Sequence, residues 1–193
     1  MVAPSQMFEH TLRPMKGWFH MAALDKAAKL AAAVTITAYA GRVVHLNASG
    51  EFEMGIAGRE VGIFVFQGSN LFAVSNPGTT GAGGFMHQAI APTGVLSGLV
   101  SIGGYELEST EFDSAPNAAY APNQLLTAVA SSNTSQTVSG VLCNDRAGAG
   151  GSTGLVRQYV DAACGVVSDG QAVNEHGVPV LKFWSVYMPA AAA

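Results

Sequence analysis

The sequence predicts a mainly β domain, an antiparallel β-barrel or β-sandwich, preceded by an N-terminal extended arm and a short helix. Short runs such as residues 34–40 and 52–56 alternate between apolar and polar residues with a period of two. The runs recur about every ten residues, and turn residues such as Asn47 to Gly50 separate them. No helical pattern lies between the runs, which excludes βαβ units and favours an antiparallel meander, sandwich or barrel.

The first 33 residues differ from the rest. Residues 1–20 carry large apolar side chains without any period, and Pro4, Pro14 and Gly17 interrupt them. We expect this arm to pack on its own domain or on a neighbouring subunit. Its candidate partner-interface residues are Met7, Phe8, Met15, Trp18 and Phe19. Residues 21–33 are rich in Ala, Leu and Lys, which are good helix formers, and predict a short helix. The predicted division is therefore 1–33 for the arm and helix and 34–193 for the β-rich domain.

Strands are predicted along the whole β-rich domain. The expected ranges are 34–40, 42–46, 52–56, 61–66, 95–102, 105–112, 155–160, 163–167 and 178–189. Residues 105–112 alternate acidic with apolar residues, so we expect a half-exposed strand with Glu106 and Glu108 on its solvated face. The last strand is apolar in both registers, one containing Trp184 and the other Phe183, so we expect it to be covered on both sides.

The composition narrows the function classes. Charged residues are only 11% of the 193 residues, against about 25% in ordinary globular chains. Such a chain is either a membrane protein or one that other proteins cover. The best membrane candidate, residues 22–40, contains Asp25, Lys26 and Lys29, and the start lacks the order of a secretory signal. We therefore expect an intracellular protein with no membrane partner. The net charge is −4 with no basic cluster, so no direct nucleic-acid binding is expected.

No motif predicts an enzyme. Residues 150–154 match the Gly-x-Ser-x-Gly pattern around Ser152, and Asp161 or Asp169 and then His176 follow in the order of a hydrolase triad. A glycine-rich loop precedes the serine where the motif needs a buried strand, so we interpret the segment as a flexible loop. The histidines show no ligand spacing, so no metal site and no cofactor are expected. Cys143 and Cys164 are expected to be reduced and buried.

Several segments resemble tailed-bacteriophage head decoration (cement) proteins. They are Gly104 to Asp113, Tyr120 to Thr127, Cys164 to Ser168, His176 to Trp184 and Tyr187 to Pro189, with Tyr39 to Leu46 and Gly58 to Gly62 similar in style. The resemblance implies a β-rich, homo-oligomeric (dimeric or trimeric) protein that binds major capsid protein on the outer surface of the shell. It implies no catalytic residue, and a virion location after assembly in the host cytoplasm.

Two other virion roles stay open. One is a phage tail or baseplate component with similar β architecture. The other is a receptor- or glycan-binding module that uses the loops at residues 76–84 and 131–139. These loops lack aromatic residues for stacking on sugars, which counts against the second role.

Overall fold

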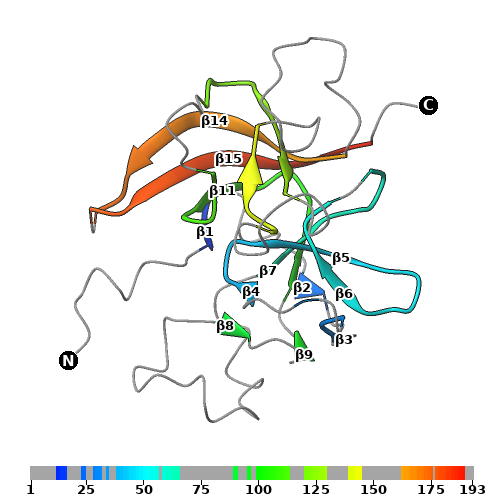
Figure 1. Cartoon of the computed structure of the whole chain (residues 1–193). Coiled ribbons are helices and arrows are strands. Elements are labelled where there is room, and N and C mark those ends of the chain that lie inside the picture. Colours follow the sequence, from blue (N-terminus) through cyan, green and yellow to red (C-terminus); the bar gives the residue numbers. More distant parts are fainter. Residues whose placement is uncertain are drawn as a thin grey trace, which may run out of the picture.

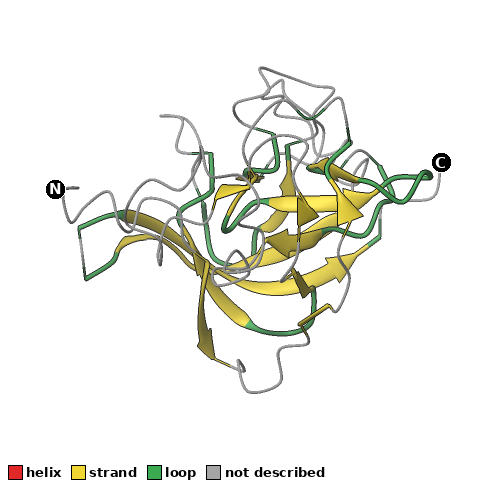
Figure 2. Ribbon diagram, turned by 90° about the horizontal axis from the view of Figure 1, so that it is seen from below, coloured by secondary structure: helices red, strands yellow, loops and turns green. Residues whose placement is uncertain are grey.

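The computed structural model describes two larger antiparallel sheets and two small ones. The described residues are 12–16, 23–24, 28–31, 34, 38–56, 58–65, 89–90, 95–96, 99–113, 120–129, 139–144, 162–175 and 177–189. Within these ranges the chain forms strands and loops without a helix (Figure 2). The mainly β prediction is therefore confirmed.

The strands follow one another in short pieces until two long ones close the chain. Their bounds are β1 Leu12–Lys16, β2 Ala23–Leu24, β3 Ala28–Lys29, β4 Ala38–Tyr39, β5 Val43–Leu46, β6 Phe52–Met54, β7 Ile63–Val65, β8 Ala89–Ile90, β9 Val95–Leu96, β10 Leu99–Ser101, β11 Glu106–Ser109, β12 Leu125–Ala128, β13 Leu142–Cys143, β14 Ala163–Val173 and β15 Pro179–Met188.

The six-stranded sheet has the order β1-β11-β15-β14-β12-β13, and the five-stranded sheet has the order β2-β10-β7-β5-β6. The remaining pairs are β3 with β9 and β4 with β8. In Figure 1 the long β14–β15 ribbon arches over β5, β6 and β7. Each larger sheet is open, since its first and last strands have no further partner among the described strands, so the barrel alternative is not formed.

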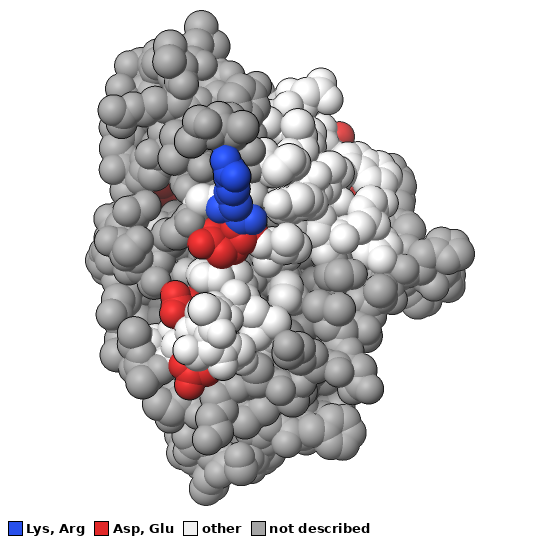
Figure 3. All heavy atoms as spheres, turned by 90° about the vertical axis from the view of Figure 1, so that its right-hand side faces the viewer, with Lys and Arg blue, Asp and Glu red and all other residues white. Residues whose placement is uncertain are grey.

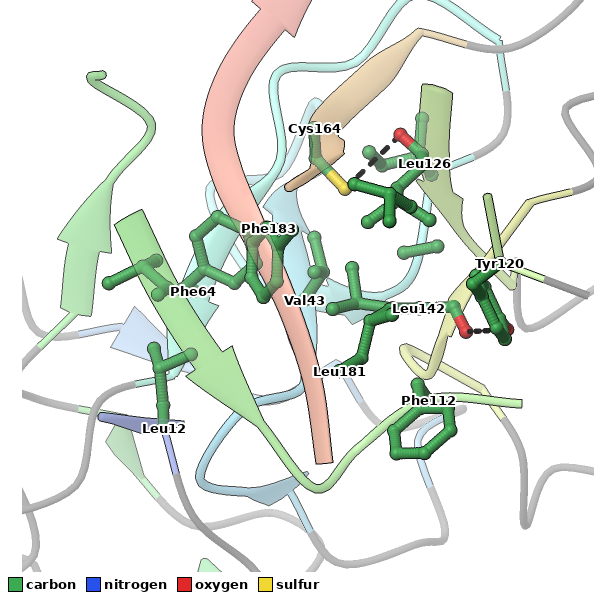
Figure 4. Close-up of a cluster of buried hydrophobic side chains, with 14 of the residues drawn as sticks. Leu12, Val43, Phe64, Phe112, Tyr120, Leu126, Leu142, Cys164, Leu181 and Phe183 are labelled. Atoms are coloured by element: carbon green, nitrogen blue, oxygen red, sulfur yellow. Dashed lines mark hydrogen bonds between the residues drawn. The ribbon is translucent and has the colours of Figure 1, made fainter. Parts of the chain in front are cut away.

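One core joins the two larger sheets. Leu107, Leu181 and Phe183 of the six-stranded sheet share a buried cluster with Val43 and Phe64 of the five-stranded sheet. The rings of Phe64 and Phe183 face each other in Figure 4, and their centroids lie 5.6 Å apart. Because alternate residues of a strand point to opposite faces, this contact fixes which face of β15 is the inner one.

A second core covers the other face of the five-stranded sheet. Val44 lies there, one residue after Val43 of the first core, as strand alternation requires. Phe52, Met54 and Val65 join it, together with Leu30, Ala31, Val34 and Ala38. The five-stranded sheet is therefore covered on both faces.

The helix predicted over residues 21–33 is not confirmed. The described residues there are extended: Ala23 and Leu24 pair with β10, and Ala28 and Lys29 pair with β9. Helix propensities differ by only a few tenths of a kcal/mol per residue, so sheet pairing overrides them. The extended arm is likewise not confirmed as such, since Leu12–Lys16 pairs with β11 as a strand of the six-stranded sheet.

Candidate interaction surface

Of the five predicted interface residues, only Met15 lies in the described part of the chain. It sits on β1 at the edge of the six-stranded sheet and is 40% exposed. Met7, Phe8, Trp18 and Phe19 lie outside the described residues. The structure therefore places one of the five at the surface and leaves their grouping as a prediction.

Strand β1 is fastened to the sheet by its side chains. Leu12 is fully buried in the first core. Arg13 forms an ion pair of 3.1 Å with Glu175, next to the turn between β14 and β15, and its Nε lies 3.9 Å from the buried carboxylate of Glu108. Pro14 has no backbone N–H group and cannot donate a hydrogen bond to a further strand, so this edge is poorly suited to pairing with another strand. These contacts hold the N-terminal strand on its own domain.

The second half of β15 is only partly covered, contrary to the expectation that both faces are covered, whereas Val180 near its start is fully buried. Leu181, Phe183 and Ser185 are buried on the inner face, whereas Trp184 is 37% exposed. Farther along, Tyr187 is 37% and Met188 38% exposed. We call the three exposed residues in the second half of β15, Trp184, Tyr187 and Met188, the β15 strip, although Tyr187 is in the register of Phe183 and not of Trp184. It is a candidate surface for a protein partner because clustered exposed apolar side chains mark such sites.

The register places further apolar residues beside Trp184. Val166 of β14 is its cross-strand neighbour, and Leu125 of β12 is in turn the neighbour of Val166. Paired residues of antiparallel strands project on the same face, so Leu125, Val166 and Trp184 form one apolar row across three strands. Val166 and Leu125 are half-buried.

The end of β15 also contacts the loop before β7. The hydroxyl of Tyr187 donates a hydrogen bond of 3.4 Å to the carbonyl oxygen of Arg59, and Val61 nearby in that loop is 54% exposed. The contact joins the two larger sheets at their margin. The Tyr187 hydroxyl therefore lies toward the loop of the five-stranded sheet.

The prediction of a solvated acidic face on β11 is wrong. Glu106 is 6% and Glu108 3% exposed, and all four residues of β11 are buried. Two cations are close to Glu108 on this face: Arg13, and Lys182, its cross-strand neighbour on β15. Burial of a carboxylate is tolerable when opposite charges are close, so Glu108 contributes to the sheet's own stabilisation.

A buried ion pair joins the loop after β11 to the start of β5. The Arg42 Nε donates to the Glu111 carboxylate at 2.7 Å, and its Nη1 donates to the Ser139 carbonyl oxygen at 3.2 Å. The guanidinium also lies 5.1 Å from the centre of the Tyr39 ring. The pair links segments of both larger sheets, and no open space for a reacting substrate adjoins it because Arg42 and Glu111 are each 6% exposed.

Tyr120 has a similar structural role. Its hydroxyl donates to the carbonyl oxygen of Asp113 at 2.8 Å, with the Leu142 carbonyl at 3.3 Å, and its ring meets Phe112 edge-on. Burial raises the pKa of the Tyr120 phenol above its ordinary value of 10.0, and the charges of Cys143 and Asp113 act in the same direction. The phenol therefore stays neutral and clamps the irregular segment after β11 to β13.

Most of the remaining sequence candidates lie outside the described residues. Ser152, Asp161 and His176 are among them, so the structure does not test the hydrolase hypothesis. Within the described ranges, no three His, Cys, Asp or Glu side chains are close enough to share a metal ion, and no helix is long and apolar enough to span a membrane. Of the histidines only His45 is described, and its Nδ1 donates to the Gly55 carbonyl oxygen at 2.8 Å.

The two cysteines are buried, as expected, and are free thiols. They lie on β13 and β14, the strands on either side of β12. The Cys164 thiol donates to the carbonyl oxygen of Leu126, with 3.7 Å between sulfur and oxygen (Figure 4).

Comparison with known proteins gives no relative: no family model, no curated protein and no solved structure matches this chain.

The β15 strip is the functional candidate that the sequence analysis missed. One signal pointed to it, since Lys182 occupies the same register as Trp184 and a lysine seldom lies in a fully covered face.

Proposed function

We propose that this protein is a virion structural protein that binds the outer surface of an icosahedral phage capsid and stabilises the lattice of major capsid protein. It would be a non-enzymatic β-sandwich protein with an N-terminal arm, and it would act as a homo-oligomer without binding DNA or a membrane. The resemblance of its segments to phage decoration proteins supplies the partner. The observation that carries the proposal is the open β15 strip on a chain with unusually little charge.

The low charge is also visible on the surface. In Figure 3 most described atoms on the face shown belong to uncharged residues; one acidic group adjoins a basic one, and other acidic groups lie apart from it. A protein that works free in solution is normally kept soluble by many dispersed charges. A chain with few charged residues is suited to having its surface covered by other subunits.

Capsid stabilisation needs no chemistry, only many contacts made at once. A protein that touches neighbouring capsid subunits makes its later contacts intramolecular, so weak individual contacts sum to durable attachment. The two-sheet core gives a rigid body to carry these contacts, because Phe64 and Phe183 fix the sheets against each other. Rigid bodies lose little conformational entropy on binding.

Co-sedimentation tests the proposal. The purified full-length protein is mixed with matching expanded shells that lack it and with unexpanded procapsids, and the pelleted protein is measured across a concentration series. We expect saturable binding to the expanded shell at a fixed ratio to the major capsid protein. Absence of binding to both shells would reject a capsid role and favour the tail or baseplate alternative.

A second candidate function, a receptor- or glycan-binding virion module, is favoured by one observation. Trp184 and Tyr187 expose aromatic surface that the predicted binding loops lacked, and flat aromatic faces stack on the apolar faces of sugar rings. Quenching of Trp184 fluorescence by host-surface polysaccharide, with no shell binding, would support this function over capsid attachment.

A further inference from the structure

Strand β1 is the end strand of the six-stranded sheet, and among the described strands it pairs with β11 alone. At the other end of the sheet, β13 is also bridged by Phe112. Residues 17–22 separate β1 from β2, which belongs to the five-stranded sheet, so no hairpin joins β1 to a neighbouring strand. Strand β11 keeps β15 as its partner on the other side. β1 can therefore leave the sheet without breaking the pairing of any other described strand.

The side chains of β1 give it little apolar anchoring. Leu12 is fully buried in the first core, whereas the Arg13 side chain is 36% and Met15 40% exposed. The pairing with β11 is interrupted by a register shift between Pro14 and Lys16. Segments with few buried apolar contacts open at a lower free energy than the whole domain. β1 has the features of such a segment.

The charge contacts of β1 go through Arg13. Its Nη1 donates a hydrogen bond of 3.1 Å to Glu175, whose side chain is 66% exposed. Its register partner is the buried Glu108, but its Nε lies 3.9 Å from Glu108 Oε1, and that oxygen accepts no hydrogen bond from the described residues. The shorter of the two contacts is therefore the exposed one, and salt screens exposed charge pairs.

We propose that β1 is a releasable strand, which leaves the edge of β11 while the two-sheet core stays folded and does so more readily as salt screens Arg13. The stretch that the sequence predicts to contact a partner, residues 7–19, contains β1. While β1 is docked, Leu12 is inside the core and cannot contact another protein. The inference rests on the proposed function in one respect, since it adds that β1 leaves β11 before this stretch binds major capsid protein. Docked β1 thus inhibits attachment.

Hydrogen exchange measured by mass spectrometry tests the release in the free protein. Amides of β1 should exchange at least about tenfold faster than the amides that join β14 to β15, and low urea concentrations should not change their rates, as in a local opening. The β14 and β15 rates should rise with urea, because exchange there requires global unfolding. Equal rates with equal urea dependence in β1 and β15 would overturn the release.

A matched pair of substitutions tests the role of Arg13. Glu175→Gln removes the charge of its hydrogen-bonded partner, and Glu53→Gln removes the charge of another partly exposed glutamate, on β6 of the five-stranded sheet. Neither glutamate belongs to a core cluster, so both variants should fold. We expect Glu175→Gln to speed β1 exchange about two- to fivefold, and Glu53→Gln to leave it unchanged. High salt should abolish the difference between Glu175→Gln and the wild type. Equal β1 rates in the two variants would contradict the role of Arg13.

A disulfide that locks β1 tests its control of attachment. Leu12 and Ser109 are register partners across β1 and β11, so their Cα atoms lie within the range that a disulfide spans. Val173 and Pro179, partners at the far end of β14 and β15, supply the control pair. We expect oxidation of the Leu12→Cys, Ser109→Cys variant to raise the apparent Kd for expanded shells at least about tenfold, and reduction to reverse this. Oxidation of Val173→Cys, Pro179→Cys should change nothing.

The outcomes separate the inference from the function on which it rests. A locked variant that binds shells as tightly as its reduced form overturns the control of attachment by β1. A wild type that binds no shell, but whose β1 amides exchange by local opening, overturns the proposed function and leaves the releasable strand in place.

Discussion

Exchange of Phe64 and Phe183 for leucine, singly and together, tests how the two larger sheets pack. Both rings are fully buried, and their centroids lie 5.6 Å apart at an interplanar angle of 40°. Removal of a buried Phe by alanine costs about 3–5 kcal/mol, so a double alanine variant would remove most of the 5–15 kcal/mol that stabilises a typical domain. Leucine keeps the site apolar and nearly filled, at about 1 kcal/mol for each substitution.

The informative quantity is the coupling between the two substitutions. A ring pair in contact contributes about 0.5–1.5 kcal/mol beyond burial. The double variant should therefore be less destabilised than the sum of the single variants by about that amount. The free energies of unfolding come from guanidinium titrations followed by circular dichroism.

Phe52 supplies the control. It is fully buried but belongs to the second core, on the other face of the five-stranded sheet. A Phe52→Leu and Phe183→Leu cycle should be additive within about 0.5 kcal/mol. If the Phe64 and Phe183 cycle is equally additive, the two rings are not in contact and the packing of the sheets described here is wrong.

Three further predictions concern single sites. Gly140 and Gly50 have φ of 80° and 76°. A Cβ at Gly140 would lie 2.8 Å from the Val43 carbonyl oxygen, whereas a Cβ at Gly50 would meet nothing within 4 Å. In urea titrations Gly50→Ala should lower the free energy of unfolding by about 1 kcal/mol, and Gly140→Ala should lower it by at least about 1 kcal/mol more. Arg42→Met should lower the free energy of unfolding by about 3–5 kcal/mol because it leaves the Glu111 carboxylate buried without its cation. Adding Glu111→Leu should recover part of that loss in the same assay. A double variant less stable than Arg42→Met would contradict the ion pair. The raised pKa of Tyr120 contributes stability below pH 10 that is lost as the pH rises above 10, where the unfolded phenol ionises first; Tyr120→Phe should flatten this fall between pH 9 and 11, and an unchanged slope would contradict it.

Strands were predicted best from the sequence where the two-residue alternation or a run of strand-forming residues was the only pattern in the segment. The alternation around Phe52 and Met54 correctly gave β6, and the β-branched and aromatic run ending at Met188 gave β15 almost to the residue. In both segments the local pattern and the tertiary pairing favour the same structure. Agreement of this kind is what makes a segment predictable.

The failures occur where tertiary structure decides. Ala28 and Lys29 are good helix formers, yet they pair with Leu96 and Val95, which are distant in the sequence. Glu106 and Glu108 look like a solvated face until the register brings Arg13 and Lys182 beside Glu108. Neither pairing can be read from a local window, because register depends on residues up to 162 positions apart, as for Arg13 and Glu175.

The candidate site was missed for a related reason. Apolar residues in both registers of β15 predicted that both of its faces are covered. Val180, Leu181 and Phe183 are fully buried, whereas Trp184, Tyr187 and Met188 farther along the strand are partly exposed. Composition cannot distinguish a face covered by the same chain from a face covered by a partner. The presence of Lys182 in the same register as Trp184 was the local sign of the difference.

Electron cryo-microscopy of expanded shells reconstituted with the purified protein tests the central claim most directly. The account predicts density for the two-sheet domain on the outer surface at regular lattice positions, with the end of β15 against major capsid protein. Shells without added density at saturating protein, or density confined to the portal and tail, would contradict the assignment as a capsid-stabilising protein.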